Sequence, residues 1–299
     1  MAGGPLRTVL FAPGDDPGKM AKAVTSGADA VVFDLEDAVA PARKEPSRVL
    51  VAEALSRRGS DPPTPPLIVR VNAAATGLLV DDLAAVALPH LAAIMVPKVE
   101  DTDTLAEVAD ALAVLRPARA IAGAPVGLIA LIESAAGVVM CERIAAAAPP
   151  STWTLAFGAA DYSADLGIEY DLAGVGLMHA RARVALAARG AGLRAALDGP
   201  VVALDDERLL REDSVRSRQL GFGGRLVLHP RQIEPVREAY GALDEAGVRR
   251  ARAIVAAFEA AQRDGRAVAV VDGEFVDPPV YRRALDQLES AGIDLSPGV

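Results

Sequence analysis

The feature that most constrains this chain is a regular alternation of short apolar runs with longer helix-patterned stretches. The apolar runs fall at residues 8–13, 29–35, 67–72, 92–98, 126–134, 152–158, 200–204 and 225–230. Most are continuous, as expected for strands that are buried on both faces of a parallel sheet. The intervening stretches suit helices, since a segment such as "DTDTLAEVADALAVLRP" opens on Asp and Thr residues that favour a helix N-terminus.

Eight strand-then-helix units in about 230 residues match the size of a (β/α)8 barrel. The main alternative is a doubly wound open sheet, which usually carries a glycine-rich phosphate loop after its first strand. The segment "FAPGDDPGK" does not fit that loop. We therefore predict an α/β fold with a (β/α)8 TIM barrel over residues 1–235, in which the Pro-rich stretch 60–67 is a stiff loop.

The pattern changes after residue 235. A long helix is predicted over roughly 236–264, and it leads to the segment "AVAVVDGEFVDPPVYRRALDQLESAGI". This tail is predicted to be an appendage, either a surface hairpin or a lid over a site. We describe residues 236–299 as a C-terminal helix and lid segment that packs on a neighbouring subunit.

Composition excludes several classes of protein. The net charge of −9 argues against a nucleic-acid surface, which needs a basic footprint. A single cysteine, Cys141, rules out a disulfide framework or a cysteine-based zinc site within the chain. No apolar run reaches the roughly 18 residues of a membrane helix, and the N-terminus lacks the apolar core of a signal peptide. We expect a cytoplasmic protein without a membrane partner.

Polar residues follow nearly every predicted strand, where a barrel of this kind builds its active site. In chain order they are Pro13 and Gly14, then Asp34, Glu36 and Asp37, then Arg70 and Asn72, Lys98, Glu133 and Ser134, Gly158 and Asp161, Asp205 and Asp206, and His229. This placement predicts a polar ring in which the carboxylates of residues 34–37 face Arg70 and Lys98.

Carboxylates that converge where cysteine and histidine are scarce indicate a hard cation, Mg²⁺ or Mn²⁺. Glu133 and Asp161 end two consecutive strands and are the predicted ligands. The alternative for this pair is a salt-bridged ring with Arg70 and Lys98. Lys98 is expected to form an ion pair rather than a Schiff base, because neighbouring carboxylates favour its charged form.

The three carboxylates after the second strand are predicted to lie next to the metal ligands rather than to bind the ion directly. Alternation along a strand places Asp34 and Glu36 on one face and Asp37 on the other. We therefore expect them, together with Lys98, to surround the ligands, with any contact to the ion passing through water.

A set of ordered motifs resembles the citrate lyase beta-subunit-like branch of the HpcH/HpaI aldolase superfamily, which includes malyl-CoA and citramalyl-CoA lyases. The motifs span residues 6 to about 284: "LRTVLFAPG", "DLEDAVAP", "RVN", "MVPKVE", "IESAAGV", "FGAADYSADLG", "GGRLVLHPRQI" and "DGEFVDPPVYRRA". The resemblance implies a (β/α)8 barrel, a carbon–carbon lyase that depends on Mg²⁺ with Mn²⁺ as a substitute, and a homo-oligomer that is a trimer or a dimer of trimers.

The resemblance also implies residue roles. Glu133 of "IESAAG" and Asp161 of "GAAD" hold the metal, Arg70 of "RVN" binds substrate and stabilises charge, and Asp277 of "VDPP" reaches a neighbouring subunit's site from the C-terminal lid. Arg70, Glu133 and Asp277 form the implied catalytic set. Further substrate contacts are expected from Pro13, Gly14, Ala160, Asp161 and His229.

The implied reaction is a retro-Claisen-type cleavage of a carboxylated 3-hydroxyacyl-CoA, such as malyl-CoA or citramalyl-CoA. The metal acts as a Lewis acid on the hydroxyl oxygen. Arg70 offsets the thioester enolate, and Asp277 carries the proton to or from the acetyl carbon. The products are acetyl-CoA and a 2-oxo acid, glyoxylate or pyruvate.

The chain departs from its relatives after the first strand. Asp15 and Asp16 stand where malyl-CoA lyase-like relatives tend to carry an arginine, so the CoA-phosphate contacts are open. Lys19 and Lys22 either replace that arginine or lie on a solvated helix face. The alternative functions are a malyl-CoA-type thioesterase, an aldolase for free hydroxy-oxo acids, a citrate lyase subunit that acts only in a complex, and an inactive scaffold.

Overall fold

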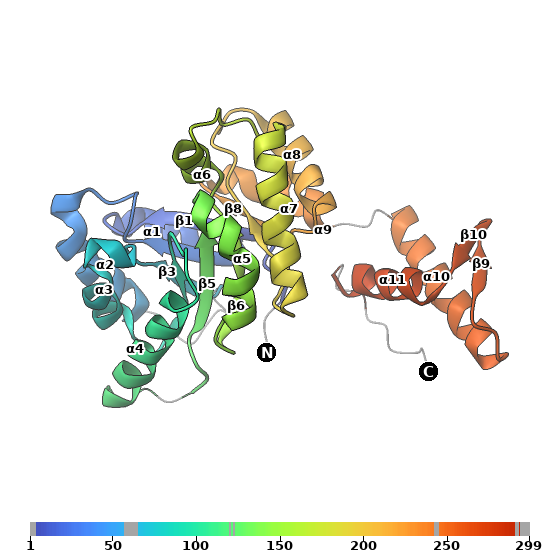
Figure 1. Cartoon of the computed structure of the whole chain (residues 1–299), viewed down its shortest axis with the longest axis horizontal. Coiled ribbons are helices and arrows are strands. Elements are labelled where there is room, and N and C mark those ends of the chain that lie inside the picture. The colour runs from blue at the N-terminus through green and yellow to red at the C-terminus, as the bar shows by residue number, and fades with distance from the viewer. Residues whose placement is uncertain are drawn as a thin grey trace. The chain divides into compact units, whose positions relative to one another are not determined.

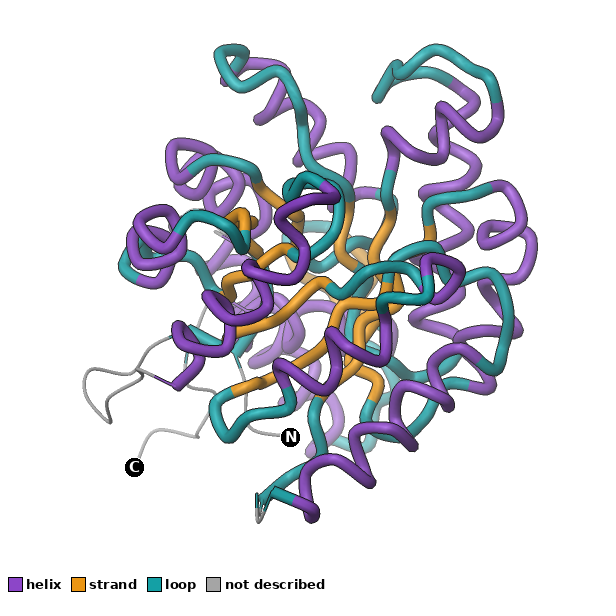
Figure 2. Tube along the Cα trace, turned by 90° about the vertical axis from the view of Figure 1, so that its left-hand side faces the viewer, coloured by secondary structure: helices purple, strands orange, loops and turns teal. Residues whose placement is uncertain are grey.

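Eight parallel strands close into a barrel with helices around it (Figures 1 and 2). The computed structural model describes residues 4–56, 65–119, 121, 123–241, 245–290 and 293. The strands are β1 (Thr8–Pro13), β2 (Ala30–Asp34), β3 (Leu67–Arg70), β4 (Leu91–Val96), β5 (Gly127–Ile132), β6 (Thr152–Phe157), β7 (Leu197–Asp198) and β8 (Gly224–Val227). Each strand pairs with the next, and β1 also pairs with β8. The predicted (β/α)8 fold is confirmed.

Helices follow the strands along the chain. They are α1 (Pro17–Val24), α2 (Lys44–Ser56), α3 (Leu79–Val86), α4 (Thr104–Ala118), α5 (Ala135–Ala147), α6 (Ala159–Leu166), α7 (Val175–Gly190), α8 (Glu207–Gln219) and α9 (Ile233–Gly241), with short 3₁₀ turns at Pro41–Arg43, Ala74–Thr76 and Pro230–Gln232. Several begin with a side-chain cap: Ser134, for example, accepts the N–H of Gly137 at the start of α5.

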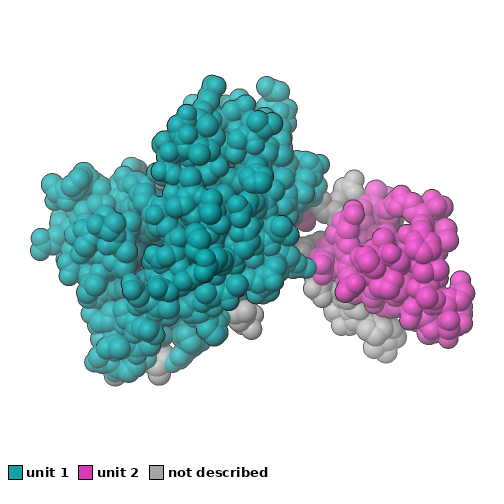
Figure 3. All heavy atoms as spheres, viewed as in Figure 1, with its two compact units in different colours: residues 1–240 teal, residues 241–299 magenta. Residues whose placement is uncertain are grey.

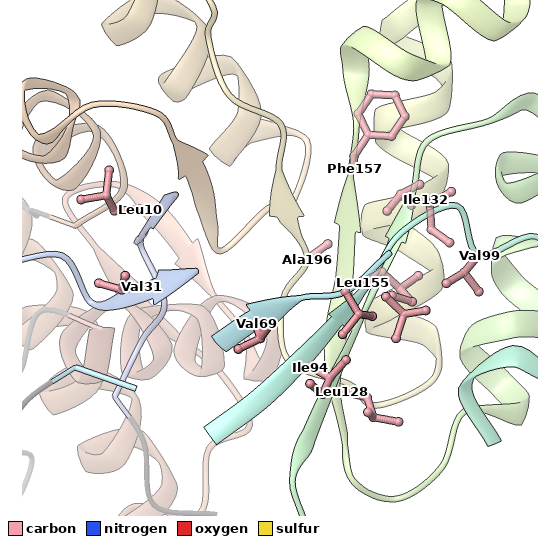
Figure 4. Close-up of a cluster of buried hydrophobic side chains, with 14 of the residues drawn as sticks. Leu10, Val31, Val69, Ile94, Val99, Leu128, Ile132, Leu155, Phe157 and Ala196 are labelled. Atoms are coloured by element: carbon pink, nitrogen blue, oxygen red, sulfur yellow. The ribbon is translucent and has the colours of Figure 1, made fainter. Parts of the chain in front are cut away.

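The continuous apolar runs are explained by two separate buried clusters. Side chains at alternate positions, such as Val32 and Ile68, fill the barrel interior. The residues between them, such as Val31 and Val69, pack outward against the helices (Figure 4). A strand of this barrel is therefore apolar on both faces.

The seventh strand differs from the prediction. It is Leu197–Asp198, which pairs with β6 and β8, and not residues 200–204. Residues 200–204 begin with a proline, which has no N–H to donate to a neighbouring strand, and no strand forms there. Asp205 and Asp206 consequently do not end a strand: Asp206 caps α8 through the N–H of Leu209.

The chain divides into two compact units, Met1–Tyr240 and Gly241–Val299 (Figure 3). The second contains α10 (Glu245–Arg263), β9 (Ala269–Val271), β10 (Glu274–Val276) and α11 (Pro278–Ser290). The C-terminal helical extension is thus confirmed, although α9 and α10 replace the single helix predicted over 236–264, and residues 242–244 lie outside the described residues. Residues 60–64 of the predicted stiff loop also lie outside them.

The second unit has a small core of its own. Phe258 on α10 stacks on Tyr281 on α11 with ring centroids 4.6 Å apart. Strands β9 and β10 are antiparallel and joined by Asp272 and Gly273, which have φ angles of 50° and 78°, as a two-residue hairpin turn with positive φ at both positions requires. The lid role of this unit remains a prediction. Nowhere in the described part of the chain is a helix both long and apolar enough to span a bilayer.

Candidate functional site

A cavity of about 410 Å³ opens at the C-terminal ends of the barrel strands. Its lining combines apolar side chains with one arginine and four carboxylates: Phe11, Pro13, Asp34, Asp37, Ala38, Arg70, Leu131, Glu133, Gly158, Ala159, Ala160, Asp161, Pro200, Leu226 and Leu228. The polar members lie at or just after the ends of β2, β3, β5 and β6. Part of the predicted polar ring, namely Asp34, Asp37, Arg70, Glu133 and Asp161, therefore lines this cavity.

Asp34 and Arg70 form a two-pronged pair at the ends of β2 and β3. The Nε of Arg70 donates to Oδ1 of Asp34 at 2.8 Å, and Nη2 donates to Oδ2 at 2.7 Å. Asp34 also accepts the backbone N–H groups of Glu36 and Ala38, at 2.9 and 3.0 Å. All the acceptor needs of this buried carboxylate are thus met within the protein.

Glu36 lies between two cations. Its Oε2 is 2.9 Å from Nη1 of Arg70, and its Oε1 accepts Nζ of Lys98 at 2.8 Å. Burial raises the pKa of Glu36, although both cations oppose that rise. Asp37 is 3.5 Å from Arg70 and its side chain is 54% exposed, so it contributes only a weak, solvated interaction.

Arg70 is fixed from several sides. Its guanidinium carbon lies 5.0 Å from the ring centroid of Phe11. Burial opposes its charged form, but the hydrogen bonds to Asp34 and the charges of Asp34, Glu36 and Asp37 together raise the pKa of Arg70 above its ordinary value. Arg70 is therefore a permanent, preorganised cation at the cavity wall.

Glu133 has a different environment. It is 2% exposed, and its Oε1 accepts the backbone N–H of Lys98 at 3.0 Å. A Cβ on Gly158 would lie 2.5 Å from Oε2, so the close approach of this carboxylate to β6 requires glycine. Burial raises the pKa of Glu133 to about 8, with the charges of Asp161 and Glu36 adding to the rise and Arg70 opposing it.

The donor set fits a hard cation. Arg70 and Lys98 pair with the carboxylates of residues 34–37 and not with Glu133 or Asp161. Within the described residues, neither Glu133 nor Asp161 has an ion pair with a cationic side chain, and the charge of Asp161 adds to the rise in the pKa of Glu133. No group of three or more His, Cys, Asp or Glu residues in that part of the chain is placed to hold a metal. Mg²⁺ is usually held by one or two protein carboxylates, with its other positions left to water and substrate oxygens, and the pair Glu133 and Asp161 would match that pattern.

The other predicted site residues divide between the cavity and its surroundings. Pro13 and Ala160 line the cavity. Gly14 packs behind it, where its N–H donates to the carbonyl of Asp34 at 2.8 Å. His229 is exposed, and its Nδ1 accepts the N–H of Arg231 at a 3₁₀ turn. Its predicted substrate contact remains a prediction.

Asp277 belongs to the second unit. It precedes α11, and its Oδ1 accepts the N–H of Val280 at 3.1 Å, as a helix cap does. That bond uses one carboxylate oxygen. Its catalytic part remains a prediction.

The acidic loop after β1 has a local structural explanation. Asp16 caps α1 by accepting the N–H of Lys19 at 2.9 Å. The ammonium of Lys19 is 3.4 Å from Asp16, and its side chain is 66% exposed. A solvated helix face therefore describes Lys19 better than a replacement for the missing arginine.

Strand alternation marks several lining residues that our sequence reasoning missed. Phe11 precedes Pro13 by two positions, and Leu131 precedes Glu133 by two, so each shares the inward face of its strand. Leu226 belongs to the same interior cluster as Leu131. Pro200 was missed because the seventh strand was misplaced.

Comparisons with known proteins show the family to which this chain is similar. A family model described as HpcH/HpaI aldolase/citrate lyase matches residues 7–230. The citrate lyase subunit beta of Leuconostoc mesenteroides subsp. cremoris is 37% identical over 281 residues, covering 93% of this chain and 90% of that protein. A (3S)-malyl-CoA thioesterase of Cereibacter sphaeroides is 34% identical over 273 residues, covering 91% of this chain and 90% of that protein.

A solved structure is similar over nearly the whole chain. It is the protein CitE from Mycobacterium tuberculosis in complex with magnesium, acetoacetate and coenzyme A. The two chains are 33% identical, with a TM-score of 0.77, and the match covers 97% of this chain and 99% of that one.

Proposed function

This chain belongs to the HpcH/HpaI aldolase/citrate lyase family, and from that premise we propose that it is a Mg²⁺-dependent carbon–carbon lyase. The resemblance first seen in its motifs is confirmed, and the family is one of enzymes. The proposed substrate is a carboxylated 3-hydroxyacyl-CoA of the malyl-CoA or citramalyl-CoA type. The proposed products are acetyl-CoA and a 2-oxo acid, glyoxylate or pyruvate.

One observation carries the proposal: Glu133 and Asp161 line one cavity without a cationic partner among the described residues. These two carboxylates would hold Mg²⁺, or Mn²⁺ in its place. A bound ion of this kind supplies Lewis-acid polarisation of a hydroxyl or carbonyl oxygen. The similar CitE structure contains magnesium together with an oxo acid and coenzyme A, which supports this assignment.

Arg70 is the proposed group that stabilises charge. Two of its five N–H donors bond Asp34 and a third, on Nη1, faces Glu36 at 2.9 Å, so two N–H donors remain for a substrate oxygen while its position is fixed. A cation that needs no reorganisation lowers the energy of a transition state in which charge develops on the thioester oxygen. Asp34 and Glu36 partly offset the positive charge of Arg70, but they also fix the position of its guanidinium.

Asp277 is the proposed carrier of the proton at the acetyl carbon. In its own unit one of its oxygens caps α11 and the other accepts no hydrogen bond from the described residues. We propose that the second unit brings this carboxylate to the site of a neighbouring copy, within a cytoplasmic homotrimer or dimer of trimers. The barrel would then bind the oxo acid and the second unit would complete the catalytic set.

A thioesterase is the second candidate, because a malyl-CoA thioesterase is among the similar proteins. In that case the same metal site would activate water against the thioester. Action as a citrate lyase beta subunit within a larger complex is a further possibility, favoured by the similarity to the Leuconostoc protein.

Product analysis separates these candidates. The purified full chain is incubated with Mg²⁺ and either malyl-CoA or citramalyl-CoA, and the products are identified by mass. Acetyl-CoA with glyoxylate or pyruvate supports the lyase, whereas free CoA with intact malate or citramalate supports the thioesterase. Turnover should disappear in Glu133→Gln and Asp161→Asn, and persist in Asp16→Asn. No turnover by the wild-type chain alone would reject the proposed independent lyase.

A further inference from the structure

Lys98 contacts both Glu36 and Glu133, and its backbone has a left-handed conformation. It follows β4 and has a φ of 51°. Among the described residues it is one of only two non-glycine residues with positive φ. This left-handed conformation is unfavourable for a lysine, so it persists only where the surroundings enforce it.

The conformation places Lys98 in contact with both carboxylate sets at once. Its backbone N–H donates to Oε1 of Glu133 at 3.0 Å. Its Nζ donates to Oε1 of Glu36 at 2.8 Å, and Glu36 in turn lies 2.9 Å from Arg70. Lys98 therefore connects Glu36, which is ion-paired with Arg70, to Glu133, which has no ion pair with a cation among the described residues.

The turn that contains Lys98 is held by β5 and α5. The N–H of Val99 donates to the carbonyl of Leu131 at 3.3 Å. Gly137, in the first turn of α5, allows the Val99 carbonyl to come close, since a Cβ on that glycine would lie 2.8 Å from it. The turn is thus pressed against the strand that carries Glu133.

Glu133 is consequently held on two sides. The amide of Lys98 donates to Oε1. On the other side Oε2 lies close to Gly158, which leaves room for it because glycine has no Cβ. In the described residues no hydrogen bond reaches Oε2. In this orientation of the carboxylate, Oε2 is left for another partner.

We propose that Lys98 is a positioning residue of the metal site. Its left-handed backbone directs its N–H to Oε1 of Glu133, which leaves Oε2 for the cation. Its ammonium binds Glu36 and so fixes the position of Glu36 and Arg70 relative to that site. This inference rests on the proposed function, because it assumes that Glu133 is a ligand. It adds a role for a backbone amide that the reaction itself does not require.

Two substitutions separate the backbone from the side chain. Lys98→Gly and Lys98→Ala both remove the ammonium, but only glycine adopts positive φ without strain. Binding of Mn²⁺ to the full chain is followed by electron paramagnetic resonance. We expect Lys98→Gly to bind within about threefold of wild type. We expect Lys98→Ala to bind about tenfold more weakly, because alanine has the same left-handed strain as the wild-type lysine but lacks the Nζ–Glu36 contact that holds the lysine in this conformation. Equal affinities for the two variants would overturn the proposal.

A matched control uses the other strained residue. Asp272 has a φ of 50° in the β9–β10 turn. Asp272→Gly and Asp272→Ala should leave the Mn²⁺ affinity unchanged. Lys98→Arg, which keeps the charge next to Glu36, should bind Mn²⁺ more tightly than Lys98→Met. Equal Mn²⁺ affinities of those two variants would reject the proposed role of the ammonium.

A metal-free measurement keeps this test independent of the proposed function. Crystal structures of both variants without metal should show the amide of residue 98 bonded to Oε1 of Glu133 in Lys98→Gly and displaced from it in Lys98→Ala. An intact bond in Lys98→Ala would reject the positioning role. Failure of wild type to bind Mn²⁺ would instead reject the metal site, whatever the two crystal structures show.

Discussion

The two sides of the cavity contain the same kind of side chain in opposite conditions. On the β2–β3 side, Asp34 is buried but receives a two-pronged bond from Arg70 and two backbone N–H groups. On the β5–β6 side, Glu133 is equally buried, yet it receives one backbone N–H, and burial and Asp161 raise its pKa to about 8. The protein supplies every partner of the first carboxylate, whereas the second has one backbone hydrogen bond and no ion pair with a cation among the described residues.

This difference shows that burial alone does not identify a ligand. A buried carboxylate with all its partners present holds the structure together, and its removal should destabilise the fold. A buried carboxylate without a partner cation strains the fold, and its removal should relieve it. The contrast can be tested from both directions.

The largest effect is expected from Asp34→Ala. It leaves the buried guanidinium of Arg70 without its main partner and two N–H groups without an acceptor. We expect a loss of about 3–5 kcal/mol in the free energy of unfolding, measured by urea titration. A loss below about 1 kcal/mol would mean that the pair contributes as little as a surface ion pair.

The next effect concerns pH in the metal-free protein. Because the folded-state pKa of Glu133 is about 8, above the unfolded value near 4.5, the folded chain binds this proton more tightly. Below about pH 4.5 Glu133 is protonated in both states and does not lower the free energy of unfolding. As pH rises from there to about 8, the free energy of unfolding falls by a few kcal/mol. Glu133→Gln should lack this fall.

Urea titrations of wild type and Glu133→Gln across that pH range provide the measurement. Saturating Mg²⁺ should reduce the difference between the two, because a bound cation offsets the charge. Parallel stability curves for the two proteins without metal would contradict the raised pKa.

A smaller effect is expected from Gly158→Ala. The added Cβ would meet the side chain of Glu133 at 2.5 Å, so the carboxylate must move. We expect a destabilisation of about 1–3 kcal/mol and weaker binding of Mn²⁺, measured by thermal unfolding and by titration. The control is Gly190→Ala at the end of α7, where an added Cβ meets nothing within 4 Å and stability should not fall.

The smallest effect is expected from Asp37→Asn. Asp37 belongs to the paired side of the cavity, but it is half exposed and 3.5 Å from Arg70. The expected change in unfolding free energy is under about 1 kcal/mol. A change as large as that of Asp34→Ala would show that the distinction between these two neighbours is wrong.

Much of the fold was predictable because the barrel buries both faces of its strands, so that seven of eight strands read as apolar runs close to their actual positions. The seventh was misplaced because its two residues, Leu197 and Asp198, carry almost no local signal and are specified by pairing with β6 and β8. Long-range pairing of this kind is absent from any short window of sequence.

The site was predictable in membership and partly in partnership. Position at a strand end marked Asp34, Arg70, Glu133 and Asp161 as neighbours. The sequence also predicted that the carboxylates of residues 34–37 face Arg70 and Lys98, as they do. It left open a second ion-paired ring of these cations with Glu133 and Asp161, because side-chain geometry across strands decides between the two. The left-handed backbone of Lys98 likewise has no signature in its residue type.

Closure of the barrel between β1 and β8 has a consequence for synthesis on the ribosome. Strand β1 finds one partner in β2 soon after it emerges, but its second partner, residues 224–227, comes near the end of the first unit. Until then the nascent sheet has an open edge on β1 that is able to pair wrongly. A chaperone that shields this edge during translation should therefore raise the yield of folded protein more than one added after release.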